Sequence, residues 1–174
     1  MASIVPAQKL IATRDALKEL VATLREQHKK IAFSNGCFEL LHVGHLRSLQ
    51  GARQHGDCLI VAVNSDASVK RYKGREHPIV PEQERAEIIA GLDCVDYVYL
   101  FDEPTVDGLL ADIRPDAYCK GPEYTMENLP ERETLRRVGG RLVQVGDPKD
   151  HSTSDLLRRI ADRQKSVCGQ GTTP

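Results

Sequence analysis

Two histidines three residues apart, His42 and His45, are the residues whose type and spacing best suit chemistry in this chain. They close the run 35–45 (NGCFELLHVGH), which follows a short β-prone segment and opens a helix-like one. Residues three apart at a helix start share one face, and the positive end of the helix dipole points the same way. Gly36 allows a tight strand exit, and Gly44 lets a bulky ligand approach the backbone. The pattern therefore favours a bound polyphosphate.

Two other interpretations of the histidine pair stay open on the residues alone. Half of a metal site is one, although no Cys, His or Glu pair elsewhere has complementary spacing, which disfavours zinc. Ordinary polar residues at a helix start are the other. Neither standard nucleotide fingerprint is present, because there is no GxGxxG pattern and Asp57 follows Gly56 where a P-loop needs lysine.

Alternating strand-like and helix-like segments must position this run. We expect strands at 31–34, 58–63, 97–101, 117–119 and 141–145, and helices at 7–28, 42–55, 82–91, 104–113, 131–138 and 152–164. The run 58–63 is apolar throughout, as in a parallel sheet that is covered on both faces. The alternation predicts a doubly wound, Rossmann-like α/β sheet of about five parallel strands with helices on both faces, the 7–28 helix among them. Ligands bind beyond the carboxyl ends of such strands, so the loops there are candidate sites.

Composition excludes several classes of protein. The chain has 174 residues, 40% apolar and 28% charged, which predicts one domain over 1–165 and a polar, disordered tail over 166–174. A net charge of −1 disfavours a nucleic-acid partner. No apolar run approaches the roughly 20 residues of a membrane span, and the N-terminus lacks a signal-peptide core. The five cysteines have no CxxC spacing, which indicates thiols in a reducing cytoplasm: 37, 58, 94, 119 and 168.

The histidine run resembles a known signature. His-x-Gly-His between a strand and a helix is typical of the HxGH nucleotidyltransferase superfamily, and GCFELLHVGH is similar to its cytidylyltransferase-like form, GCFDLLHxGH. The resemblance spans about residues 31–160 and includes KRYKG at 70–74, KGPEY at 120–124 and Ser-Thr-Ser at 152–154. Two positions depart from it. Glu39 stands where most members have Asp, and His77 stands where relatives often carry Arg, so we assign no role to His77.

The resemblance implies that a sugar phosphate oxygen attacks the α-phosphorus of a nucleoside triphosphate and that pyrophosphate leaves. Because this nucleophile is already ionised, catalysis reduces to alignment and charge neutralisation. The expected catalytic residues are His42, His45 and Lys73. The expected nucleotide-binding residues are Gly36, Cys37, Phe38, Gly44, Asn64, Asp66, Lys120, Gly121, Ser152, Thr153 and Ser154. The expected acceptor-binding residues are Arg71, Arg85 and Glu123. Mg²⁺ would arrive with the nucleotide, since no dedicated carboxylate cage is visible.

Among the branches of the superfamily, the chain is most similar to the nucleotidyltransferase module of the ADP-heptose synthase type, a sugar-1-phosphate adenylyltransferase. This implies ATP and heptose 1-phosphate as substrates and a role in ADP-heptose and lipopolysaccharide biosynthesis. The length leaves no room for the sugar kinase often fused to that module, so we expect the stand-alone version. Dimers are common in relatives, and a homodimer stays open. One alternative is a cytidylyltransferase acting on a glycerol-phosphate-type acceptor, although residues 146–154 lack the motif that is common in those enzymes. The other alternative is a non-catalytic nucleotide-binding module.

Overall fold

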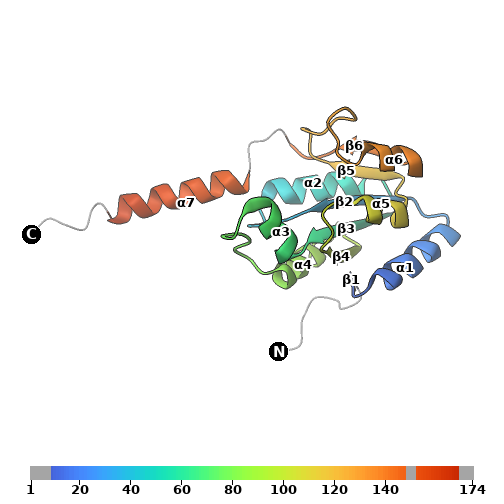
Figure 1. Cartoon of the computed structure of the whole chain (residues 1–174), viewed down its shortest axis with the longest axis horizontal. Coiled ribbons are helices and arrows are strands. Elements are labelled where there is room, and N and C mark those ends of the chain that lie inside the picture. The colour runs from blue at the N-terminus through green and yellow to red at the C-terminus, as the bar shows by residue number, and fades with distance from the viewer. Residues whose placement is uncertain (1–8, 148–151, 169–174) are drawn as a thin grey trace, which may run out of the picture.

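Six parallel strands form one sheet in the computed structural model, which describes residues 9–147 and 152–168 (Figure 1). In chain order they are β1 (Leu10–Ile11), β2 (Ile31–Gly36), β3 (Cys58–Asn64), β4 (Tyr97–Phe101), β5 (Ala117–Lys120) and β6 (Arg141–Gln144). Their order across the sheet is β1-β4-β3-β2-β5-β6. The chain therefore leaves β2 in one direction and returns to its other side at β5, which creates a topological switch point between these two strands.

Helices cover both faces of this sheet. They are α1 (Arg14–Glu26), α2 (Val43–Arg53), α3 (Asp66–Lys73), α4 (Glu82–Ala90), α5 (Asp107–Ile113), α6 (Arg132–Val138) and α7 (Thr153–Cys168). One hydrophobic cluster joins α1, α5 and α6 to side chains such as Phe33 and Ile60. A second cluster joins α2 and α4 to Leu59, Val61 and Val63. Neighbouring residues of β2 and β3 thus belong to opposite clusters, which confirms the predicted doubly wound α/β sheet.

The predicted helix over 7–28 is wrong at its start. Leu10 and Ile11 form the edge strand β1, which pairs with Val98 and Tyr99 of β4 and makes the sheet six-stranded rather than five-stranded. The helix begins only after Thr13, whose side-chain oxygen accepts a hydrogen bond from the amide of Ala16 at 3.1 Å. This N-cap satisfies one of the amides that a helix start leaves without a partner. Residues 1–8 lie outside the described part of the chain.

The 64–81 segment, expected as a loop, contains helix α3. Ser65 caps it by accepting from the amide of Ser68 at 3.0 Å, and Gly74 ends it with a φ of 97°. This positive φ suits glycine, which lacks the Cβ that makes the conformation costly. The last turn of α3 carries Lys73, so a helix rather than a flexible loop presents this lysine.

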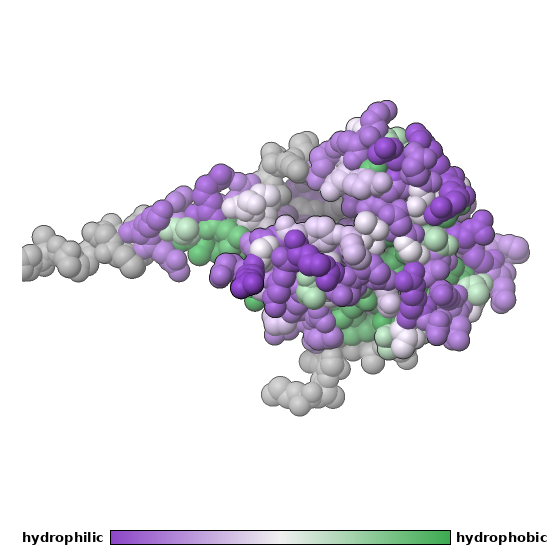
Figure 2. All heavy atoms as spheres, viewed as in Figure 1, coloured by the Kyte–Doolittle hydropathy of each residue, from purple (hydrophilic) through white to green (hydrophobic). Residues whose placement is uncertain are grey.

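Helix α7 continues past the expected end at residue 164. It runs to Cys168 and so includes the first three residues of the expected disordered tail. No glycine or proline lies between Thr153 and Gly169, so the sequence offers no helix stop earlier. The rest of the expected tail, 169–174, lies outside the described residues. Figure 1 shows α7 extending away from the sheet, and Figure 2 shows hydrophobic residues on one side of this helix. Among the residues of α7, Ile160 is half exposed. No helix in the described ranges is long and apolar enough to cross a membrane.

Candidate functional site

A cavity of about 820 Å³ opens at the carboxyl ends of the strands, next to the switch point. Its floor includes Asn35 from β2, Asn64 from β3, Phe101 from β4 and Lys120 from β5. This is the position at which doubly wound sheets bind their ligands. The loop that links β2 to α2, the end of α3 and the start of α7 also line the cavity.

Most of the predicted site residues meet around this cavity although they are far apart in the sequence. The predicted residues that line it are Gly36, Cys37, Phe38, His42, Gly44, His45, Asn64, Lys73, Lys120, Gly121, Glu123, Ser152 and Thr153. Histidines, lysines and a helix N-terminus therefore share one hollow, a combination suited to a polyphosphate.

Four predicted site residues do not line the cavity. Arg85 is 1% exposed, and its guanidinium donates to the carbonyl oxygens of Val80 at 2.9 Å and Cys37 at 2.5 Å. It also donates to Asp66 at 2.7 Å, so both of these residues support the loop that carries Cys37. Arg71 pairs with Asp102 at 3.2 Å outside the cavity, and Ser154 is exposed on α7. Because Arg85 is buried and each of its three guanidinium nitrogens already donates within the protein, it is not placed to contact an acceptor phosphate.

The two histidines are built into the start of α2. His42 is the N-cap, and its Nδ1 accepts from the amide of Gly44 at 3.2 Å. The Nδ1 of His45 accepts from the amide of His42 at 3.4 Å. Because each Nδ1 accepts, each neutral ring carries its proton on Nε2. The capping contacts thus fix the tautomer in which Nε2–H is the donor.

The charge state of His45 follows from its surroundings. Burial, together with the neighbouring His42 and Lys73, lowers the pKa of His45 to about 4. The two imidazole rings stack with centroids 3.9 Å apart, and Phe38 meets the His45 ring edge-on at 5.5 Å. Two cationic rings at that separation would repel each other. His45 is therefore a neutral hydrogen-bond donor at pH 7.

Lys120 occupies the floor of the cavity. Its Nζ lies 3.3 Å from Oδ1 of Asn35 and 4.6 Å from the centroid of the Tyr124 ring. Burial lowers the pKa of Lys120, while the carboxylates of Glu131 and Glu123 act in the opposite direction. The side chain of Lys120 thus places its nitrogen at the bottom of the cavity, beside Asn35 and Tyr124.

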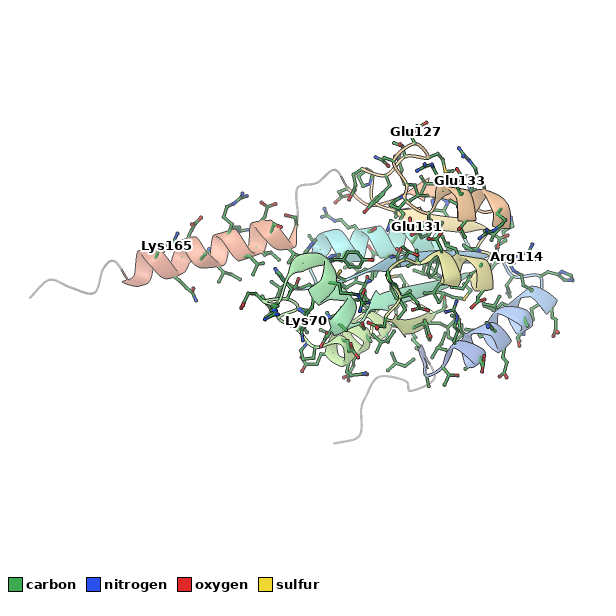
Figure 3. The ribbon with its side chains drawn as sticks, viewed as in Figure 1. Lys70, Arg114, Glu127, Glu131, Glu133 and Lys165 are labelled. Atoms are coloured by element: carbon green, nitrogen blue, oxygen red, sulfur yellow. The ribbon has the colours of Figure 1, made fainter. Side chains whose placement is uncertain are left out.

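Two acidic residues at the site were not predicted from the sequence to belong to it. Glu131 is 9% exposed and lines the cavity, and its Oε2 has no hydrogen-bond partner among the described residues. In Figure 3 it lies inside the molecule, whereas Glu127 and Glu133 lie at the periphery. Glu39 is fully buried and accepts hydrogen bonds from Lys73 at the end of α3 and from the amide of Ile79 after it. No motif marks Glu131, and Glu39 was noted only as a departure from a motif.

The start of α7 is held against the histidine loop. Ser152 caps the helix, because its hydroxyl oxygen accepts from the amide of Asp155 at 3.1 Å. The hydroxyl of Thr153 donates to the backbone oxygen of Glu39 at 2.8 Å. The helix N-terminus therefore faces the same cavity as His42 and His45, and its amides add to the attraction for anions.

Curated proteins are similar in sequence to most of this chain. Bifunctional protein HldE of Pelobacter propionicus is 44% identical over 153 residues, which cover 88% of this chain and 31% of that protein. Bifunctional protein HldE of Streptomyces coelicolor is 44% identical over 143 residues, 82% of this chain and 31% of that protein. The chain thus spans about a third of the length of these curated relatives.

Solved structures show the same fold. The lipopolysaccharide core biosynthesis protein from Thermoplasma volcanium GSS1 has a TM-score of 0.59 at 26% identity, over 70% of this chain and 99% of that one. Pantoate-beta-alanine ligase from Francisella tularensis has a TM-score of 0.56 at 15% identity, over 90% and 77%, and supports the fold alone. Residues 33–159 match the family described as cytidylyltransferase-like. The resemblance of the histidine motif is thereby confirmed: the chain belongs to the cytidylyltransferase-like family of nucleotidyltransferases.

Proposed function

We propose that this chain transfers AMP from ATP to a sugar 1-phosphate, heptose 1-phosphate in particular, to give an ADP-sugar and pyrophosphate. One observation carries the proposal. His42, His45, Lys73, Lys120 and the N-terminus of α7 all face one cavity at the switch point of the sheet. The similarity to HldE proteins and to a lipopolysaccharide core biosynthesis protein supports the choice of acceptor.

In the proposed reaction, an oxygen of the acceptor phosphate attacks the α-phosphorus of ATP. The bond from that phosphorus to the oxygen bridging the β-phosphate breaks, and pyrophosphate leaves with the electron pair. The acceptor oxygen is already anionic, so the chain needs donors and cations rather than a strong base. Nε2–H of His45 and the ammonium of Lys73 would stabilise the charge that accumulates on phosphate oxygens in the transition state.

The cavity is large enough for two substrates. Its volume of about 820 Å³ lies in the upper part of the ~300–1,000 Å³ range of small-molecule sites. The nucleotide would lie over Gly36, Cys37, Phe38 and Lys120, with its triphosphate toward His45 and α7. Thr105, Tyr124 and Glu131 also line the cavity, and we place the sugar beside them.

Mg²⁺ is proposed to enter with the triphosphate. In the described part of the chain, no group of three or more His, Cys, Asp or Glu side chains is placed to hold a metal ion. Mg²⁺ commonly uses one or two carboxylates together with substrate phosphates, so the donor set suits an ion carried by the nucleotide. Glu123 and Glu131 line the cavity and are carboxylates that could hold it together with the phosphates. When bound, the ion would neutralise charge on the phosphates.

A matrix of nucleoside triphosphates against phosphorylated acceptors, read by pyrophosphate release, tests the proposal. Release with ATP and heptose 1-phosphate is the expected result. Release with CTP and glycerol 3-phosphate would replace it with the cytidylyltransferase alternative. Nucleotide binding without turnover in any combination would favour a non-catalytic module.

We also propose a cytoplasmic location, which suits an ATP-consuming enzyme. Light scattering would test whether the protein forms a homodimer.

A further inference from the structure

Glu39 and His77 contact each other, although they are 38 residues apart and neither had a role predicted from the sequence. The Nδ1 atom of His77 lies 2.9 Å and 3.0 Å from the two carboxylate oxygens of Glu39. We propose that Glu39 and His77 form a positioning pair that holds Lys73 over the cavity. The consequence for catalysis rests on the proposed function, whereas the positioning itself does not.

The carboxylate of Glu39 is the centre of this arrangement. Its side chain is 0% exposed, and a buried charge of this kind persists only when it is paired and hydrogen-bonded. The amide of Ile79 donates to it at 2.9 Å, and Nζ of Lys73 lies 3.3 Å away. Burial alone would raise the pKa of Glu39, but the hydrogen bonds from His77, Ile79 and Lys73 outweigh it and lower the pKa. All three partners belong to the segment 73–79.

The backbone around Glu39 points to the same conclusion. Phe38 and Leu40, the residues on either side, have φ values of 49° and 48°. Non-glycine residues rarely adopt this left-handed region, and they remain there only where surrounding contacts hold them. The carboxylate contacts of Glu39 provide such a hold. The loop is therefore shaped to bring this one side chain inward.

Glu39 also connects the other phosphate-facing elements. It lies in the loop that leads to His42 and His45, and its backbone oxygen accepts from the hydroxyl of Thr153 at 2.8 Å. One residue thus links the histidine loop, the lysine at the end of α3 and the start of α7. These three elements come from distant parts of the chain and must be aligned within a fraction of an ångström for charge stabilisation to be effective.

Lys73 depends on this link because the rest of its surroundings are open. Its side chain is 37% exposed, and residues 70–76 all lie at the surface. Glu39 is the hydrogen-bond partner that the structure gives its Nζ. His77 and the Ile79 amide keep the carboxylate in place when Lys73 turns toward a phosphate. The pair would therefore set the starting position of the lysine without touching substrate.

A double-mutant cycle that changes the side-chain lengths of Glu39 and His77 tests this inference. Glu39→Asp shortens the acid by one methylene, and His77→Arg lengthens the base. We expect each single variant to lower kcat/KM by about tenfold and the double variant to return to within about threefold of the wild type, because residues in contact are not additive. The matched control is Asp116→Glu, which alters an acid held by Arg25 and the Ile31 amide outside the cavity and should leave kcat/KM unchanged.

A second readout does not require activity. Trypsin cleaves after lysine and arginine, and the exposed segment 70–76 contains four such sites. We expect faster cleavage there in both single variants than in the wild type, and a return toward the wild-type rate in the double variant. If circular dichroism shows that Glu39→Asp does not fold, His77→Gln is tested instead. This single substitution is expected to speed cleavage of the 70–76 segment.

Two outcomes would overturn the positioning pair. One is a double variant whose losses simply multiply, and the other is unchanged cleavage of the 70–76 segment in the folded single variants. If the wild type releases no pyrophosphate with any substrate combination, the proposed function fails, while the cleavage cycle still decides the positioning role.

Discussion

Replacing His45 tests the donor role that the structure assigns to its Nε2. Glutamine places an amide N–H about where Nε2 of histidine lies, whereas asparagine matches the position of Nδ1. His45→Gln should therefore keep part of the activity. His45→Asn and His45→Ala should lower kcat by at least about tenfold, toward the 10²–10³ typical of losing a preorganised donor. ATP binding should change much less, because the donor acts mainly on charge that develops in the transition state.

The fold should survive these changes. The capping contact that His45 accepts from the amide of His42 is long, at 3.4 Å, so its loss should cost less than about 1 kcal/mol. The pKa of His45 adds a pH-dependent effect, since burial places it near 4 rather than near 6.5. As pH falls from 6.5 to 4, His45 binds a proton in the unfolded chain before it does so in the folded chain. The free energy of unfolding therefore declines by at most about 3 kcal/mol. His45→Gln should lack this decline.

Three measurements check this account of His45. Pyrophosphate release at saturating ATP gives kcat, urea unfolding at pH 7 and pH 4.5 gives the stability difference, and an NMR titration locates the His45 imidazole. His55→Ala, a histidine removed at the other end of α2, is the matched control and should change none of them. Wild-type kcat in His45→Asn, or an imidazole that titrates near 6.5, would refute the reasoning.

Further predictions concern the lysine, the base and the buried arginine. Lys73→Ala should weaken binding of the triphosphate or the acceptor far more than it lowers the melting temperature; a large loss of stability with intact kinetics would make the lysine structural. ATP should raise the melting temperature more than CTP at equal concentration, and equal or better protection by CTP would contradict the proposed nucleotide. Arg85→Ala should destabilise the fold by about 3–5 kcal/mol in urea unfolding, because it leaves Asp66 and two carbonyl groups without their partner. A stable Arg85→Ala protein that binds the acceptor weakly would instead restore Arg85 as an acceptor contact.

Much of this protein could be predicted from short stretches of its sequence. The apolar run 58–63 is buried throughout, as its lack of polar alternation predicts. The spacing of His42 and His45 places both at a helix start, because three residues make about one helical turn. Lys120 ends an apolar strand and Ser152 opens a helix, and both positions are recognisable from the neighbouring residues. These features depend on residues within a few positions of one another.

Other features were decided only by the tertiary structure. Strand β1 has two residues and exists because β4 offers an open edge to Leu10 and Ile11. Helix α3 buries only Ser68 and Val69, too few for a periodic pattern. The burial of Arg85 and the contact of Glu39 with His77 join residues 48 and 38 positions from their partners. The spacing of apolar and polar residues in the sequence indicates the period of a helix or strand. It does not indicate which distant side chains come into contact once the sheet has formed.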